Sequence, residues 1–155
     1  MSGESALAWL QAHAPDLKLI DHARSTATVA EAAEVLGVEP GRIAKSLAIR
    51  VGETVYLILA RGDARLDNAR CKAELGGRPR MLDAEETLAV TGHAVGGVCP
   101  FGLASDLPIL ADRSLLDYPT VFPAAGTRTS SVEVEPARLA ELVGARWAGV
   151  CKLPE

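Results

Sequence analysis

Two features of the sequence are suited to chemistry: a lysine set among aliphatic residues and a loop crowded with glycines. The stretch IAKSLAIR, residues 43–50, alternates as a β-strand, and by strand parity Lys45 shares the face of the large aliphatic residues. An ammonium on that face suits the cationic floor of a pocket, whereas the plainer alternative is a side chain that bends to the edge of the sheet. Lys45 is therefore a candidate catalytic residue, and the small polar Ser46 follows it.

The glycine-rich loop is the segment TGHAVGGVCPFG, residues 91–102, with the pattern G-x3-GG-x2-P-x-G. Such dense glycines permit positive φ angles and let backbone N–H groups approach a ligand with no Cβ in the way. The segment lacks the G-K-[ST] of a Walker loop and the spacing of a dinucleotide fingerprint, and an ordinary turn is the alternative. A second small-residue turn, FPAAGTRTSS (122–131), can form another wall of the same pocket.

Other kinds of active site fit the sequence poorly. The three histidines, His13, His22 and His93, have no metal-ligand spacing, and no G-x-S-x-G motif is present, so neither a metal nor a serine-hydrolase elbow is expected. Cys99 lies inside the glycine-rich loop and could act as a nucleophile. Since the sequence offers it no clear histidine base, a packing role is favoured. No cofactor is expected.

Length and composition indicate one globular domain over residues 1–155, with 48% hydrophobic and 23% charged residues. No apolar run approaches a membrane span, and three scattered cysteines predict neither a disulfide framework nor a zinc site, so a reducing cytoplasm is the expected location. The net charge of −4 argues against indiscriminate nucleic-acid binding. Residues 61–80, with six basic and three acidic side chains, are a candidate phosphate-contacting edge or simply a solvated helix.

The elements that must position these residues alternate along the chain. Helices are expected over 5–13, 28–37, 67–75, 83–90 and from Pro136 onward, with T-x-x-E and D-x-x-E capping boxes at Thr28 and Asp83. Strands are expected over 16–22, 43–50, 54–60, near 108–112, 120–123 and 130–134, and over 145–151. Because Gly52-Glu53 makes a hairpin while helices join other strands, the pattern predicts an α/β domain with a mixed sheet.

Taken together, I-x-K-[ST]-L, the glycine pattern about fifty residues later and the A-G-T turn before a strand resemble the YbaK/ProX family. These are aminoacyl-tRNA deacylases related to the editing domain of bacterial prolyl-tRNA synthetase. The resemblance runs over essentially the whole chain. It implies a single compact α/β domain with a mixed, partly barrel-like sheet surrounded by helices.

The resemblance also implies a site and an activity. Lys45, Gly96 and Gly97 map to catalytic positions, and the residues implied in substrate binding are Thr28, Ser46, Pro100, Gly102, Ala124, Gly126 and Ser131. The implied reaction is trans-acting hydrolysis of a mischarged tRNA ester carrying a small amino acid (Ala, Ser, Thr or Cys), with the acceptor end of tRNA and prolyl-tRNA synthetase or another synthetase as partners. A non-catalytic module that binds aminoacyl-tRNA ends or a synthetase is the alternative.

Two departures from the family pattern bear on the substrate. His93 stands where a Tyr or Phe is frequent, and Ala124 and Ser131 replace the Ser and Asp of the cysteinyl-tRNA-deacylating branch. The glycine motif and Lys45 are intact.

Overall fold

The centre of the protein is a mixed β-sheet built around one long hairpin. The structure is a computed structural model that describes residues 2–154. Strands β2 (Ile43–Val51) and β3 (Thr54–Arg61) are antiparallel and join where Val51 pairs with Thr54, which confirms the predicted turn. The sheet order is β5-β2-β3-β6-β9 with β7 beside β2, and β3, β6 and β9 run parallel. Its remaining strands are β5 (Arg80–Met81), β6 (Ile109–Asp112), β7 (Phe122–Pro123) and β9 (Arg146–Ala148).

This arrangement confirms the predicted mixed sheet in a single α/β domain. The path ends at β5 and β9, so within residues 2–154 the sheet stays open and does not close into a barrel. Residues 1 and 155 of the expected domain lie outside the described range.

Helices surround the sheet and begin where the sequence places their caps. The Thr28–Glu31 and Asp83–Glu86 capping boxes both form. In each, the side chain of the first residue accepts a hydrogen bond from the backbone N–H of the glutamate, and the glutamate side chain accepts one from the backbone N–H of the first residue. The α-helices are α1 (Ser2–His13), α2 (Val29–Leu36), α3 (Asn68–Leu75), α4 (Ala84–Thr91) and α5 (Pro136–Val143). No helix within residues 2–154 is both long and apolar enough to cross a bilayer.

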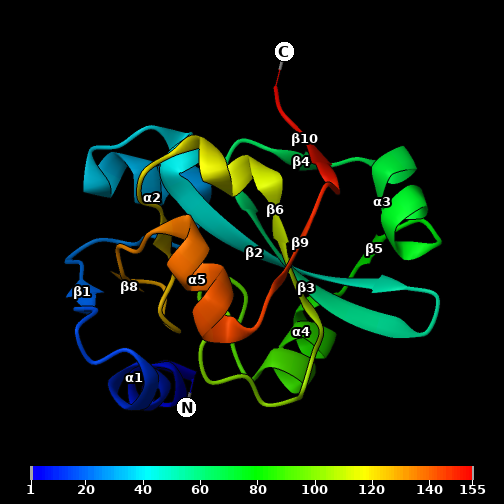
Figure 1. Ribbon diagram of the computed structural model, residues 1–155. Helices are drawn as coiled ribbons and strands as arrows, with labels where there is room; N and C mark the ends of the chain where they lie inside the picture. The colour runs from blue at the N-terminus through cyan, green and yellow to red at the C-terminus, as the bar shows by residue number, and fades with distance from the viewer. Residues whose placement is uncertain (1, 155) are drawn as a thin grey trace.

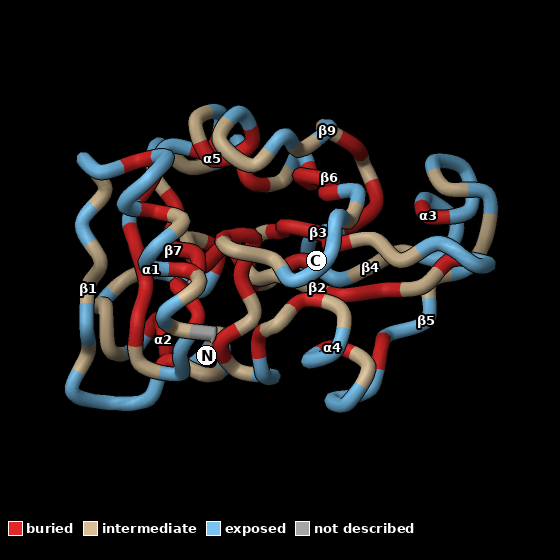
Figure 2. The backbone as a smooth tube through the Cα atoms, turned by 90° about the horizontal axis from the view of Figure 1, so that it is seen from below, coloured by how far each residue is buried: buried red, intermediate tan, exposed pale blue. Residues whose placement is uncertain are grey.

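Alternation along β3 gives each face of the sheet its own buried cluster. Leu57 and Leu59 pack with residues of α1 and α5, whereas Ile58 and Ala60 pack with Cys71 of α3. Figure 2 shows α3 on one side of the buried strands β2 and β3, with α1 and α2 on the other. Figure 1 shows the same separation, with α1 and α3 at opposite ends of the molecule.

Strand β2 has a gap along the edge opposite β3. At this edge β7 pairs only with residues 43–44 and β5 only with residues 49–50. The Ala48 carbonyl accepts a 3.1 Å hydrogen bond from the N–H of Leu82, so it points to this edge. Because backbone groups alternate sides along a strand, the N–H and C=O of Ser46 also face this edge, where no strand pairs with them.

The strands predicted near 120–123 and 130–134 are shortened to β7 and β8 (Ser130–Ser131), and two others differ more from the structure. The strand over 16–22 is wrong except at β1 (Ile20–Asp21), because the N–H of Leu17 bonds the Ala14 carbonyl in a turn, and β1 meets only the two-residue β8. The strand over 145–151 divides into β9 and β10 (Cys151–Lys152).

A buried carboxylate causes that division. Asp112 accepts hydrogen bonds from the N–H groups of Val150 and Cys151 at 2.9 and 3.0 Å, which turns the chain away from β6. Strand β10 instead pairs with β4 (Arg65–Leu66), a short strand that the sequence pattern missed.

Candidate active site

The open edge of β2 forms one wall of a cavity of about 350 Å³, called the central pocket here. Its other walls are the start of α2, the glycine-rich loop (residues 91–102) and the second turn (residues 122–131). The pocket brings together six of the residues predicted for the site: Thr28, Lys45, Ser46, Gly96, Ala124 and Ser131. Segments far apart in sequence therefore meet at the gap in the sheet edge.

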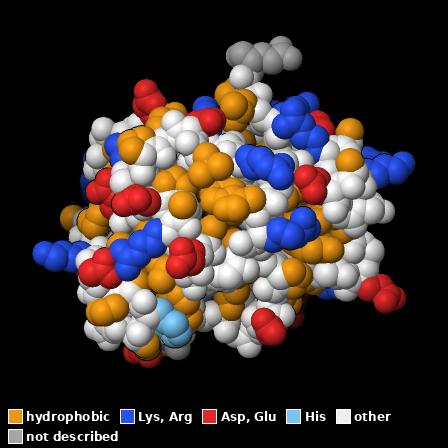
Figure 3. All heavy atoms as spheres, viewed as in Figure 1, with side chains coloured by type: hydrophobic (Ala, Val, Ile, Leu, Met, Phe, Trp, Pro, Cys, Tyr) orange, Lys and Arg blue, Asp and Glu red, His pale blue; other side chains and the backbone are white. Residues whose placement is uncertain are grey.

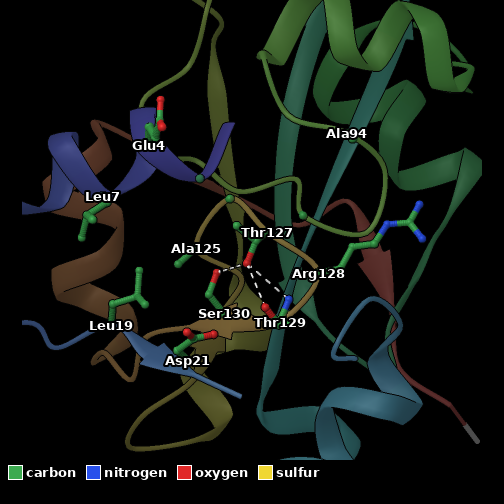
Figure 4. A pocket seen from close by; sticks show the side chains of 13 residues that line it. Glu4, Leu7, Leu19, Asp21, Ala94, Ala125, Thr127, Arg128, Thr129 and Ser130 are labelled. Carbon is green, nitrogen blue, oxygen red and sulfur yellow. Dashed lines mark hydrogen bonds between the residues drawn. The ribbon is translucent and has the colours of Figure 1, made fainter. Parts of the chain in front are cut away.

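The other four predicted residues lie outside this pocket. Gly97 and Gly126 line a neighbouring cavity of about 530 Å³, the side pocket, which α1 and the second turn enclose (Figure 4). Pro100 and Gly102 line a third hollow beside Trp9. Gly102 has a φ of +64°, and a Cβ there would lie 2.4 Å from the Ser5 carbonyl oxygen, so its place is explained by packing.

Ser46 presents the most unusual polar group of the central pocket. Its Oγ is buried and has no hydrogen-bond partner within the described part of the chain. A buried polar group without a partner is rare because its lost hydration is not replaced. The same residue turns its backbone N–H and C=O toward the gap, so Ser46 offers three unsatisfied polar groups at one wall.

The paired glycines of the loop have different surroundings. Gly97 donates its N–H to the Ala94 carbonyl at 2.9 Å, and a Cβ on it would lie 2.9 Å from the Gly126 carbonyl oxygen. Gly96 has a φ of +96°, and across residues 2–154 its N–H has no hydrogen-bond partner. Gly96 is thus the free donor of the pair, whereas Gly97 locks the loop against the second turn. The catalytic role predicted for Gly97 stays a prediction that would require its present bond to break.

Lys45 lines the central pocket, but its ammonium is engaged elsewhere. It donates a hydrogen bond to the carbonyl of Ala64, a residue of the cluster around Ile58, on the opposite face of the sheet from the Ser46 side chain. Burial lowers the pKa of Lys45, and this effect outweighs the opposing influence of the nearby Cys151 and Asp63. The lysine is thus half-buried, as strand parity predicts, and its catalytic role stays a prediction.

Ser131 and Thr28 enter the pocket with their hydroxyls already in use. The Ser131 Oγ lies 2.8 Å from Nε2 of His22, a histidine 109 positions earlier that no local sequence motif marks. Thr28 Oγ1 accepts the N–H of Glu31 as the cap of α2. Antiparallel pairing of β1 with β8 is what brings His22 beside the pocket, and such a long-range contact leaves no local pattern.

Cys99 and His93 form a buried pair within the glycine-rich loop. The Cys99 Sγ lies 3.6 Å from the His93 Nε2, and that nitrogen also bonds the Phe101 carbonyl at 2.8 Å. Burial raises the pKa of the Cys99 thiol to about 12 and lowers that of His93. A neutral thiol with no exposed surface is a poor nucleophile, which supports the packing role. Within residues 2–154 no group of three His, Cys, Asp or Glu side chains is placed to hold a metal.

The basic segment over 61–80 is partly neutralised by its own neighbours. The Arg61 guanidinium contacts Asp63 at 2.7 Å and Asp117 at 2.8 Å, and Arg80 lies 3.4 Å from Glu86. On the face seen in Figure 3, basic and acidic side chains are interspersed. Attraction of an anionic ligand must therefore come from individual cations near the site.

Comparison with known proteins places this geometry in a family. Residues 23–142 match the aminoacyl-tRNA editing domain. A Bacillus subtilis (strain 168) protein, "Uncharacterized protein YwhH", is 49% identical over 130 residues, which cover 83% of each chain. The "Putative Cys-tRNA(Pro)/Cys-tRNA(Cys) deacylase EbsC" of Enterococcus faecalis (strain ATCC 700802 / V583) is 30% identical over 121 residues, 76% of this chain and 73% of that one.

A solved structure agrees with these sequence matches. The crystal structure of "a putative trans-editing enzyme for prolyl tRNA synthetase" matches with a TM-score of 0.89 and 36% identity over 97% of both chains. The chain belongs to the aminoacyl-tRNA editing domain family, whose members are described as deacylases acting on aminoacyl-tRNA.

Proposed function

We propose that this protein is a trans-acting deacylase that hydrolyses the ester of mischarged tRNA carrying a small amino acid. The observation that carries the proposal is the central pocket, a small cavity lined both by Gly96, whose N–H is free, and by Ser46, whose hydroxyl has no partner in the described chain. The partners of such an enzyme are the acceptor end of tRNA and, through shared substrate, prolyl-tRNA synthetase or another synthetase.

The chemistry needs little more than placed hydrogen-bond donors. An aminoacyl ester is already an activated acyl group, so a positioned water can attack it once the developing oxyanion is stabilised. Two backbone donors without a partner in the described chain, the N–H groups of Ser46 and Gly96, belong to different walls of the pocket and are suited to that oxyanion. Their rigidity, from a sheet strand and from a loop locked by Gly97, means that little reorganisation accompanies the reaction.

Lys45 supplies the positive charge in this scheme. In the free protein its ammonium is held by the Ala64 carbonyl, although the residue also lines the central pocket. When the Lys45 side chain rotates around the open edge of β2, its ammonium reaches a bound phosphate or ribose, or the carbonyl of the ester. The hydrogen bond to Ala64 then acts as a resting position for the lysine.

The size of the pocket favours small acyl groups. Ala44, Ala48 and Ala124 line it together with Gly96 and Ser46, and its volume of about 350 Å³ must also admit part of the terminal ribose. We therefore expect alanyl, seryl, threonyl or cysteinyl esters to be cut and prolyl or phenylalanyl esters to be spared. One methylene is worth only about 1–3 kcal/mol, so several small residues should be accepted.

The test is an incubation of catalytic amounts of protein with a panel of labelled aminoacyl-tRNAs. Multiple-turnover release of alanine or serine supports the proposal, whereas stoichiometric protection of the ester identifies a binding module. Ala124→Val is the matched size variant, because it narrows one wall and should lower turnover on the threonyl ester more than on the alanyl ester. Rapid hydrolysis of prolyl-tRNA with the alanyl and seryl esters untouched would overturn this assignment.

A further inference from the structure

Arg128 is an exposed arginine without a partner at the boundary between the two pockets. Several other arginines have a carboxylate partner: Arg42 lies 3.3 Å from Glu133, and Arg138 lies 2.5 Å from Asp16. Within residues 2–154, no carboxylate lies within ion-pair distance of the Arg128 guanidinium. In a protein with a net charge of −4, an uncompensated cation beside the site is the local attraction that an anionic substrate requires.

The side chain of Arg128 crosses directly over Gly96. A Cβ built on Gly96 would lie 3.1 Å from both the Cγ and the Nε of Arg128, and 3.1 Å from the Cβ of Ala27. Figure 4 shows the guanidinium extending beside the loop that carries Ala94, away from Leu7 and Leu19 of the side pocket. The Arg128 side chain therefore packs against Gly96, the residue of the glycine-rich loop that has the free N–H and that lines the central pocket.

The backbone from which Arg128 projects is held on both sides. Its carbonyl accepts hydrogen bonds from the N–H and the hydroxyl of Thr26, at 2.6 and 3.1 Å. The neighbouring Thr127 and Ser130 hydroxyls bond each other at 2.6 Å, and the N–H of His22 bonds the Thr129 carbonyl at 2.7 Å. The fixed backbone therefore anchors the point from which the Arg128 side chain reaches over Gly96.

We propose that Arg128 binds the phosphate on the 5′ side of the terminal nucleotide and so sets the aminoacyl ester over the Gly96 N–H. The inference rests on the proposed function, because that phosphate is the anion nearest to the ester in the substrate. A guanidinium matches a phosphate in charge and in its planar fork of donors, and backbone donors at Gly96 lie within the reach of one nucleotide. Arg128 then acts as a positioning residue, and its loss weakens binding of the substrate in the position that places the ester over Gly96.

The test uses two small substrates that differ only in the phosphate. These are the 3′-alanyl or seryl ester of adenosine and the same ester of adenosine 5′-phosphate, compared by kcat/KM. For the wild-type protein we expect the phosphate to raise kcat/KM by a factor of about 10–100, mainly through KM, because it adds a charge-assisted hydrogen bond to the bound substrate. Arg128→Gln should bring the ratio of the two esters close to one, and Arg128→Lys should restore part of it.

The matched control is Arg146→Gln, an exposed arginine in β9 at the far end of the sheet from β2, 3.9 Å from the Glu74 carboxylate. This control should keep the wild-type ratio. An equal slowing of both esters by Arg128→Gln would show that the residue only supports the turn, and an unchanged ratio would show that it does not meet the phosphate; either outcome overturns the inference. If the wild-type protein cuts both esters at the same rate, only the Arg128 inference falls. If it cuts neither ester nor any charged tRNA, the proposed function falls as well.

Discussion

Replacing Ser46 with alanine should make the protein more stable and a weaker deacylase. The Ser46 Oγ is buried without a hydrogen-bond partner in the described chain, and such a group costs about 1–3 kcal/mol of stability. Removing the hydroxyl removes that cost and leaves a methyl group that fits the same space. For a chain of 155 residues, a gain of about 1 kcal/mol corresponds to a Tm increase of about 2–4 °C.

Ser130→Ala is the matched control for stability. Ser130 is also a buried serine, but its Oγ bonds the Thr127 hydroxyl at 2.6 Å, so the variant should lose about 1 kcal/mol and lower the Tm. Calorimetric unfolding of both variants at one pH measures the difference in sign. If Ser46→Ala is destabilised as much as Ser130→Ala, the Ser46 hydroxyl already has a structural partner and the reasoning is refuted.

The activity of Ser46→Ala supplies an independent part of the prediction. A polar group of the substrate that pairs with the Ser46 hydroxyl loses one hydrogen bond in the variant, so kcat/KM should fall about tenfold. Greater stability with unchanged turnover would mean that the substrate never meets this hydroxyl.

Two further predictions concern the other residues predicted to be catalytic. Lys45→Met should abolish deacylation, while Lys45→Arg should retain activity at alkaline pH, where the wild type declines as its buried lysine, with its lowered pKa, loses its proton. The unfolded chain binds the Lys45 proton more tightly than the folded protein does, so the wild-type free energy of unfolding should rise with pH between the lowered pKa and the ordinary 10.5. Urea titrations of Lys45→Met should lack this rise. An identical rise in both proteins would refute the lowered pKa of Lys45. Gly97→Ala places a Cβ 2.9 Å from the backbone oxygen of Gly126, so it should lose about 1–3 kcal/mol of unfolding free energy, more than Gly77→Ala, whose Cβ meets only a side-chain methyl at 3.0 Å. Equal losses would mean that the loop is not locked at Gly97.

The sequence predicted the parts of this protein that depend on local chemistry. Capping boxes, the hairpin at Gly52-Glu53 and the half-buried Lys45 all follow from residue types within a few positions, and the structure confirms them. The division of the last strand depends on Asp112, which lies 38 and 39 positions before the N–H groups that it binds, so no local pattern reveals it.

The site shows the same limit. Alternation in IAKSLAIR predicts where Lys45 points, but it cannot show that β5 and β7 leave the middle of β2 unpaired. Likewise, the glycine pattern finds the loop without telling which of its two central N–H groups is free. His22 and Arg128 reach the pockets only through the pairing of β1 with β8 and the fixed second turn. Sequence therefore identified the segments of the site, and tertiary pairing decides which atoms of those segments are available.

If backbone N–H groups stabilise the oxyanion, their removal should matter more than the loss of any hydroxyl. Ser46→Pro tests this at one atom, because the N–H of Ser46 faces the gap and proline there removes no bond to β3. Loss of one oxyanion donor typically lowers kcat by a factor of about 10²–10³, so Ser46→Pro should be far slower than Ser46→Ala while still unfolding cooperatively. Leu47→Pro is the structural control, since alternation turns its N–H toward β3 and its loss should weaken the hairpin itself. Equal turnover in the proline and alanine variants at Ser46 would mean that the oxyanion is bound elsewhere, and the Gly96 N–H would then remain as the donor to test.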